Sequence, residues 1–137
     1  MKTLVMMPTY NESQGIQHSL EHLLGAVPDV DVLVIDDNSP DGTATLVSGL
    51  AQDNPRIKLM LRQSKQGLGK AYLAGYKWGI EAGYQRLVQM DADGSHRPED
   101  LPKLLSQTSP VVIGSRWVPG GEVLNWPLSR QLISRFG

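Results

Sequence analysis

Short apolar runs alternate with segments of helical hydrophobic spacing along most of this chain. The apolar runs lie at residues 3–7, 32–35, 57–61, 87–90 and 111–115. The helical patterns lie at residues 16–27, around 46–50, at about 70–82 and at 98–105. Strands that alternate with helices of this length favour a mostly parallel sheet with right-handed crossovers. The pattern therefore predicts a three-layer α/β fold with Rossmann-like alternation.

Two local features refine this expectation. Pro8 follows the first apolar run directly and is expected to end the first strand. The third helix has its apolar positions at Leu73, Ala74, Tyr76 and Ile80. These side chains are the ones expected to pack on the sheet.

Composition excludes several function classes. The chain has 137 residues, a length typical of one domain, and a net charge of -1, which gives no basic footprint for nucleic acid. It has no cysteine, so disulfides, thiolate zinc sites and cysteine nucleophiles are excluded. No apolar run approaches the length of a membrane span. We therefore expect a cytoplasmic protein without a transmembrane segment in this chain.

Acidic side chains follow three of the expected strands. Glu12 follows the first strand, Asp36 and Asp37 follow the second, and Asp91 and Asp93 follow the fourth. The carboxyl ends of parallel strands meet at one edge of a sheet, where ligands bind. Carboxylates gathered there repel one another unless a ligand or cation offsets their charge. The pattern therefore predicts a ligand site at this edge.

Asp91 and Asp93 are two residues apart, so their side chains share a face of an extended chain. Such a pair suits a divalent cation that also binds phosphate oxygens, as Mg²⁺ or Mn²⁺ does with a nucleotide. The alternative is an acidic surface turn with Asp93 and Gly94 at its corner.

The polar loops do not match two common nucleotide-binding motifs. A dinucleotide-binding enzyme would carry Gly-x-Gly-x-x-Gly after the first strand, where residues 8–12 read Pro-Thr-Tyr-Asn-Glu. Residues 64–71 resemble a phosphate loop, but Ser64 replaces its first glycine and Ala71 its metal-binding Ser or Thr. A carboxylate such as Glu12 or Asp37 can instead accept N–H groups of a base, and either guanine or uracil offers them.

Four segments together resemble the motif series of family-two glycosyltransferases. They are residues 8–12, 35–43, 90–93 and 114–116. The Ser-Pro-Asp-Gly-Thr wording of residues 39–43 and the spacing of Gly120, Trp126 and Arg130 are most similar to the polyprenol-phosphate (dolichol-phosphate) mannose synthases of that family. The resemblance covers essentially the whole chain.

This resemblance implies a glycosyltransferase A fold and a mannosyltransferase that uses GDP-mannose and Mg²⁺ or Mn²⁺. The implied reaction moves mannose to a polyprenyl (dolichyl-type) phosphate at a membrane surface, with inversion at the sugar. Two alternatives stay open: a family member that uses a UDP-sugar, and a non-catalytic nucleotide-binding fragment.

The resemblance also implies roles for individual residues. Asp91 and Asp93 would bind the metal, with Ser95 nearby, and Asp93 and Arg116 would be catalytic. The nucleotide-sugar site would comprise Pro8, Tyr10, Glu12, Ile35, Asp37, Asp91, Ala92, Asp93, Arg116 and Arg130. For Arg116 and Arg130 the alternative is an ordinary solvated arginine.

Synthases of this kind continue beyond the point that corresponds to Gly137. We therefore expect residues 1–137 to form a single nucleotide-sugar-binding domain that is truncated at its C-terminal end. A missing C-terminal part or a second chain would complete the acceptor site. Residues 126–135 resemble the start of a basic amphipathic helix, which is typical of a segment at a membrane surface. The expected location is the cytoplasmic face of a membrane.

Overall fold

The computed structural model describes residues 2–92 and 97–106. The chain falls into two compact units, Met1–Glu99 and Asp100–Gly137. In the second unit the described helix is α4 (Leu101–Leu105), and a short 3-10 turn, η1 (Pro98–Asp100), precedes it in the sequence. The strand expected at 111–115 and the helix expected at 126–135 lie outside the described residues.

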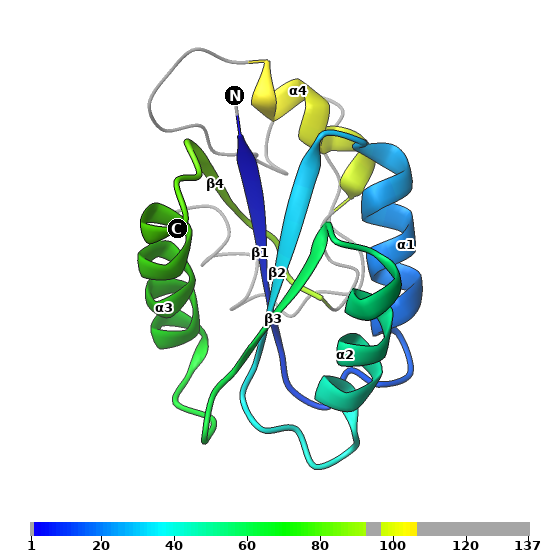
Figure 1. The fold of residues 1–137 in the computed structure, drawn as a ribbon, viewed down its shortest axis with the longest axis vertical. Coiled ribbons are helices and arrows are strands. Elements are labelled where there is room, and N and C mark those ends of the chain that lie inside the picture. The colour runs from blue at the N-terminus through cyan, green and yellow to red at the C-terminus, as the bar shows by residue number, and fades with distance from the viewer. Residues whose placement is uncertain (1, 93–96, 107–137) are drawn as a thin grey trace, which may run out of the picture. The chain divides into compact units, whose positions relative to one another are not determined.

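The first unit alternates strands and helices in the order that the sequence predicts (Figure 1). Its elements are β1 (Thr3–Thr9), α1 (Ile16–Ala26), β2 (Val30–Asp36), α2 (Thr43–Asp53), β3 (Ile57–Leu61), α3 (Leu68–Glu81) and β4 (Arg86–Gln89). The strands form one four-stranded sheet in the order β3-β2-β1-β4, and every neighbouring pair is parallel. The predicted α/β class is therefore confirmed.

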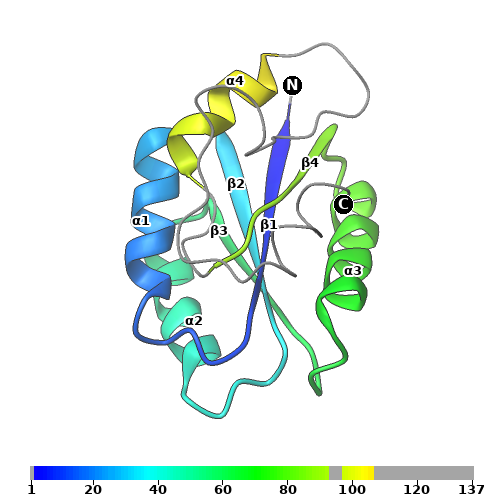
Figure 2. The same ribbon diagram turned by 180° about the vertical axis from the view of Figure 1, so that it is seen from behind.

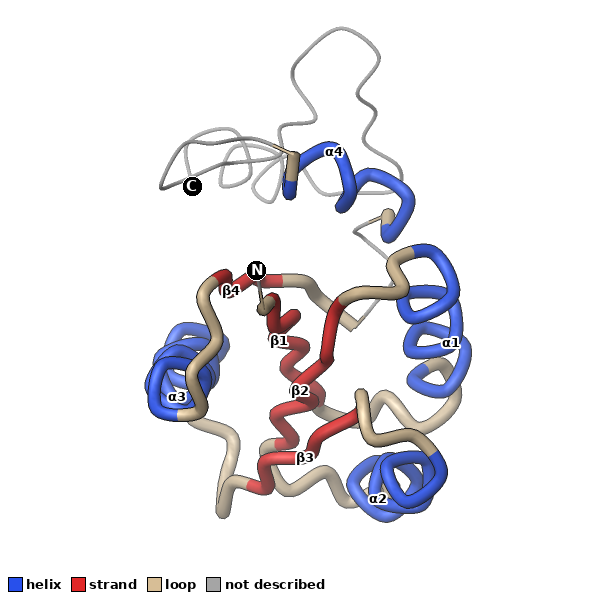
Figure 3. Tube along the Cα trace, turned by 45° about the horizontal axis from the view of Figure 1, so that its top comes forward, coloured by secondary structure: helices blue, strands red, loops and turns tan. Residues whose placement is uncertain are grey.

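The helices cover both faces of the sheet. Figure 3 shows α1 and α2 on one face and α3 on the other. The chain builds β1, β2 and β3 outward in one direction and then returns through α3 to place β4 on the other side of β1 (Figure 2). This reversal creates a topological switch point between the loops that follow β1 and β4, which is where such sheets bind ligands.

The strand β1 runs two residues further than predicted, because Pro8 does not interrupt it. The Met6 carbonyl accepts a hydrogen bond from the Met90 N–H at 3.0 Å, so the backbone groups of Met6 point toward β4. Pro8 points the same way, two residues later, but pairing with β4 ends at Met6. A backbone N–H at position 8 would have no partner on the β4 side, so proline costs the sheet no hydrogen bond there. Pro8 and Thr9 stay paired with β2 on the other side.

The helix α3 packs on the sheet through its small residues, which differs from the predicted apolar face. Leu73 and Ile80 are 68% and 67% exposed. The buried positions are instead Ala71, Tyr72, Gly75 and Gly79. A Cβ on Gly75 would lie 2.7 Å from Ile35 Cδ1, and one on Gly79 would lie 2.6 Å from Leu87 Cδ2. The missing side chains thus let the helix backbone approach the sheet closely.

The start of α2 is fixed by Asp41 and Gly42. The Asp41 carboxylate accepts hydrogen bonds from the Thr43 hydroxyl and from the Thr43 N–H, the latter at 3.1 Å. Its other oxygen accepts the N–H of Ser13 at 3.0 Å. Gly42 has a φ of 86°, a left-handed conformation that glycine adopts without strain. Hydrogen bonds from Thr43 and Ser13 lower the pKa of Asp41 to about 2.

Among the described residues, none of the helices has the length and apolar character needed to cross a bilayer.

The close contact of α3 predicts that Gly79→Ala destabilises the protein. The added methyl group would lie 2.6 Å from Leu87 Cδ2 and 3.2 Å from Leu4 Cδ2, and overpacking of this kind typically costs about 1–3 kcal/mol, against a helix-propensity gain of up to about 1 kcal/mol. Gly49→Ala is the matched control, because Gly49 lies inside α2 with no atom within 4 Å of an added Cβ. This change should raise stability by up to about 1 kcal/mol. Urea unfolding of both variants measures the difference, and equal stability of Gly79→Ala and the wild type would contradict the packing.

The lowered pKa of Asp41 predicts a pH-dependent contribution to stability. A carboxylate whose pKa falls on folding stabilises the folded state above its unfolded value, 3.8, and loses that effect as the pH drops toward about 2. The wild type should therefore be more stable than Asp41→Asn at neutral pH, and the gap should narrow through this acidic range. Unfolding midpoints of the two proteins at several pH values test this. A gap that stays constant would be inconsistent with these hydrogen bonds.

Candidate functional site

Asp36 ties the end of β1 to the loop after β2. Its side chain is fully buried, and Oδ1 accepts hydrogen bonds from the Thr9 hydroxyl at 2.7 Å and the Ser39 hydroxyl at 2.6 Å. Oδ2 accepts the Ser39 N–H at 2.9 Å. A buried carboxylate needs such donors to offset its lost hydration. Asp36 is therefore a structural acid, although the sequence places it beside the candidate ligand-binding residues.

Further hydrogen bonds hold the loops after β1 and β2 against each other. The Asn11 N–H donates to the Ser39 hydroxyl at 2.9 Å, and the Glu12 N–H donates to the Thr43 hydroxyl at 3.1 Å. Asn11 and Asn38 have φ values of 56° and 57°, a left-handed conformation that asparagine tolerates better than most residues. Tyr10, Glu12 and Asp37 are thereby held at the same edge of the sheet, as predicted.

Asp37 and Arg62 form a buried ion pair at this edge. Asp37 Oδ1 lies 3.4 Å from Arg62 Nη1, and the two side chains are 8% and 14% exposed. Within the described part of the chain, neither of these two atoms has a hydrogen-bond partner. The opposite charges of the two groups offset part of their lost hydration. The pair therefore places a carboxylate acceptor next to a guanidinium donor at this edge.

Sequence reasoning missed Arg62. It directly follows β3, and its backbone N–H donates to the Asp36 carbonyl at 2.8 Å, which extends the sheet by one residue. The sequence did carry a signal for Arg62, because a residue directly after a parallel strand lies at the same edge of the sheet as the acids that follow the other strands.

Asp91 lies at the same edge, beyond β4 and across β1 from Asp37. It is half-buried, and its Oδ1 accepts a hydrogen bond from the Tyr72 hydroxyl at 2.9 Å. Tyr72 belongs to α3 and was not predicted as a site residue. It joins the apolar cluster that includes Leu4 and Met6, so its ring is held in the core while its hydroxyl reaches the edge.

The chemistry of Asp91 fits a divalent cation, because carboxylate oxygens are ligands that Mg²⁺ and Mn²⁺ prefer. The second predicted metal ligand, Asp93, lies outside the described residues. Within the described ranges, His, Cys, Asp and Glu do not gather in groups of three or more that could hold a metal. Of the two predicted metal ligands, Asp91 is thus the one that lies within the described residues and could contribute to such a site.

The other predicted site residues differ in accessibility. Tyr10 is 37% exposed, and Lys65 Nζ lies 4.5 Å from its ring centroid. Pro8 and Glu12 are half-buried. Ala92 is buried, and its carbonyl accepts the Ser19 hydroxyl at 3.4 Å.

Among the predicted nucleotide contacts, Ile35 has the position that gives the least support to a contact with the base. It has no exposed surface and packs beneath Gly75 of α3, so its contact with a base stays a prediction. Ser95, Arg116 and Arg130 lie outside the described residues.

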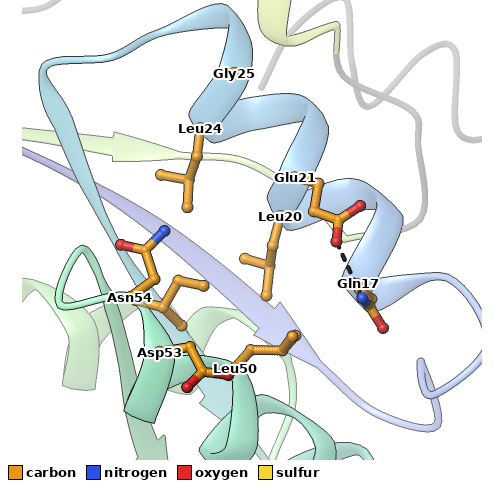
Figure 4. Close-up of a pocket in the computed structure, with 9 residues that line it drawn as sticks. Gln17, Leu20, Glu21, Leu24, Gly25, Leu50, Asp53 and Asn54 are labelled. Carbon is orange, nitrogen blue, oxygen red and sulfur yellow. Dashed lines mark hydrogen bonds between the residues drawn. The ribbon is translucent and has the colours of Figure 1, made fainter.

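A groove of about 410 Å³ between α1 and α2 is separate from this edge (Figure 4). Its floor is apolar, with Leu20, Leu24 and Ile57, and Gln17 and Glu21 on its rim share a hydrogen bond of 3.0 Å. Ile57 begins β3, so the groove lies toward the amino ends of the strands. None of the described residues at the carboxyl edge lines it, and it is therefore not the candidate site.

Known proteins that are similar to this chain include two sequence relatives at 50% identity or more and a solved structure. The chain is 52% identical to an undecaprenyl-phosphate mannosyltransferase of Micrococcus luteus, over 100% of this chain and 57% of that protein. It is 50% identical to a polyprenol monophosphomannose synthase of Mycolicibacterium smegmatis, over 98% of this chain and 52% of that protein. The chain thus spans about half the length of these relatives.

The solved structure is a mannosyltransferase of Pyrobaculum calidifontis in complex with GDP-Man and Mn²⁺. Its TM-score is 0.59 at 27% identity, over 67% of this chain and 27% of that chain. This likeness confirms the predicted glycosyltransferase A fold. The model of the family described as "Glycosyl transferase family 2" matches residues 4–136, which is nearly the whole chain. By this match and by its identity to the two relatives, the chain belongs to glycosyl transferase family 2.

Proposed function

We propose that this chain is the nucleotide-sugar-binding part of a metal-dependent mannosyltransferase that transfers mannose from GDP-mannose to a polyprenyl phosphate. The observation that carries the proposal is the ion pair of Asp37 and Arg62 at the ligand-binding edge of the sheet, where Asp37 Oδ1 lies 3.4 Å from Arg62 Nη1. The two sequence relatives are named for transfer of mannose to polyprenyl phosphates, and the solved structure holds GDP-Man and Mn²⁺. Both facts support this donor and acceptor.

The base of the donor would bind beside Asp37 and Arg62. Guanine presents N–H donors and the O6 acceptor on one edge, and a carboxylate next to a guanidinium offers the complementary groups. The N–H donors would bind the Asp37 carboxylate, and the Arg62 guanidinium would donate to the oxygen. Tyr10, Glu12 and Pro8 on the neighbouring loop would surround the nucleoside.

The diphosphate end of the donor would lie toward Asp91, Ala92 and Asp93, on the other side of β1. Asp91 and Asp93 would hold Mg²⁺ or Mn²⁺, which neutralises negative charge on the departing diphosphate. Arg116 and Arg130 would add positive charge at the phosphates. The choice between the two metals is left to experiment.

The proposed reaction is a direct displacement. An oxygen of the polyprenyl phosphate forms a bond to the anomeric carbon while the bond from that carbon to the GDP oxygen breaks, which inverts the configuration and releases GDP. A phosphate monoester is largely ionised at neutral pH, so the nucleophile needs little help from a general base. The principal contribution of the protein is to position the donor and to balance charge.

The acceptor places the whole protein at a membrane surface. A polyprenyl chain stays in the bilayer, so the donor site would work at a membrane surface, for which we propose the cytoplasmic face. We propose that residues 1–137 contribute one donor-binding domain, and that a further C-terminal part or a second chain completes the acceptor site. The transfer reaction is proposed for the whole protein.

The proposed donor predicts selective, metal-dependent nucleotide binding. Calorimetry with GDP, UDP and GDP-mannose, each with and without Mn²⁺, should show the tightest binding for the guanine nucleotides in the presence of Mn²⁺. Preference for UDP would instead favour a UDP-sugar-dependent member of the family. Binding that ignores Mn²⁺ would favour a non-catalytic nucleotide-binding module.

The role of Asp37 predicts that Asp37→Asn weakens GDP binding about 10-fold or more, both with and without Mn²⁺. The amide keeps the size of the side chain but loses a charge-assisted hydrogen bond, typically about 1.5–3 kcal/mol. Asp53→Asn is a suitable control, because Asp53 is an exposed acid that lines the groove between α1 and α2. Calorimetry measures both affinities, and urea unfolding checks that each variant is folded. Wild-type affinity in a folded Asp37→Asn variant would remove Asp37 from the base site.

A further inference from the structure

The phenol of Tyr72 is well placed to control the orientation of Asp91. Its hydroxyl donates to Asp91 Oδ1 at 2.9 Å, and its side chain is 8% exposed. Tyr72 comes from α3, whereas Asp91 follows β4, so the hydrogen bond joins two elements that meet at the edge of the sheet. The carboxylate is therefore held by a group that lies in the core.

The position of the phenol is set by the packing of α3. Gly75 lies one turn after Tyr72, and the gap left by its missing side chain is filled by Ile35 and Met6. Ile35, Met6 and Tyr72 belong to one cluster of buried residues. A buried aromatic ring has few alternative rotamers, so the hydroxyl oxygen has little freedom to move.

We propose that Tyr72 is a positioning residue for metal-dependent donor binding and that it acts by fixing the orientation of the Asp91 carboxylate. The inference rests on the proposed function, in which Asp91 helps to hold a divalent cation and the diphosphate. Hydrogen-bond partners behind a ligating carboxylate typically contribute 10–100-fold to metal affinity, because they set the direction of its oxygens. Tyr72 belongs to this class of residue, because its hydroxyl donates to Asp91.

Tyr76 provides a matched control on the same helix. It lies one turn after Tyr72, and both tyrosines line a hollow of about 440 Å³ together with Gln89. The Tyr76 hydroxyl accepts a hydrogen bond from Gln89 Nε2 at 2.6 Å. Tyr76→Phe therefore removes the same chemical group and one side-chain hydrogen bond, but it leaves the hydrogen bond to Asp91 in place.

The test compares Mn²⁺ binding in the wild type, Tyr72→Phe and Tyr76→Phe. Calorimetry gives the Mn²⁺ affinity at saturating GDP and the GDP affinity without metal, and urea unfolding checks the fold of each variant. In Tyr72→Phe the Mn²⁺ affinity should fall about 10-fold or more while metal-free GDP affinity is retained. Tyr76→Phe should retain both affinities.

Two outcomes would overturn the role of Tyr72 alone. One is wild-type Mn²⁺ affinity in Tyr72→Phe, and the other is an equal loss of GDP affinity with and without Mn²⁺, which would indicate a purely structural residue. The proposed function fails in a different way, namely if the wild type shows no Mn²⁺-dependent GDP binding. That result would overturn the role of Tyr72 as well, since no metal site would remain to be positioned.

Discussion

The candidate site depends on the hydrogen bonds that the buried carboxylate of Asp36 accepts. Taken out of water, it is stabilised by three hydrogen bonds, from the Thr9 hydroxyl and from both donors of Ser39. These bonds join the end of β1 to the loop after β2, and Ser39 in turn holds Asn11. The charge of Asp36 is thus offset by hydrogen bonds within the protein, which leaves the neighbouring Asp37 as the acid available to the proposed ligand.

The reversal of strand order gives this edge two sides with different chemistry. On the β2 and β3 side, Asp37 and Arg62 offer an acceptor and a donor next to each other, which suits the edge of a base. On the β4 side, Asp91 offers a carboxylate whose oxygen is held by a phenol, which suits a cation that in turn binds phosphate oxygens. A nucleoside diphosphate has these two kinds of group at its opposite ends, so the division of charge along the edge matches the proposed donor.

Hydrophobic pattern predicted the fold well but the individual roles of residues less well. The β3 strand agrees with residues 57–61, and α1 agrees with the pattern at 16–27 to within one residue, because long-range packing reinforces the local periodicity there. Pro8 was wrongly expected to end β1. Its missing N–H would matter only if a strand were paired on the side of β1 that this N–H would face, and pairing with β4 ends before Pro8. The face of α3 was predicted only in part: Tyr76 packs against the core, but periodicity weighs large apolar side chains, whereas the buried positions of this helix are Ala71, Tyr72, Gly75 and Gly79.

The candidate site shows the same division. Gathering of acids at one edge follows from parallel strands alone, so Glu12, Asp37 and Asp91 could be placed from the sequence. Which acid is structural could not be predicted, because Asp36 and Asp37 are adjacent and differ only in what surrounds them. Tyr72 reaches Asp91 from another element, and no local sequence signal reports such a distant hydrogen bond.

The glycines of α3 have a consequence for how this protein can diverge. Gly79 and Leu87 occupy one shared space, since a methyl group on the first would overlap the second. A side chain at 79 would therefore require Leu87 to shift, and alanine at 79 would be accommodated most easily beside a smaller side chain at 87. The packing couples these two positions, even though one lies in a helix and the other in a strand.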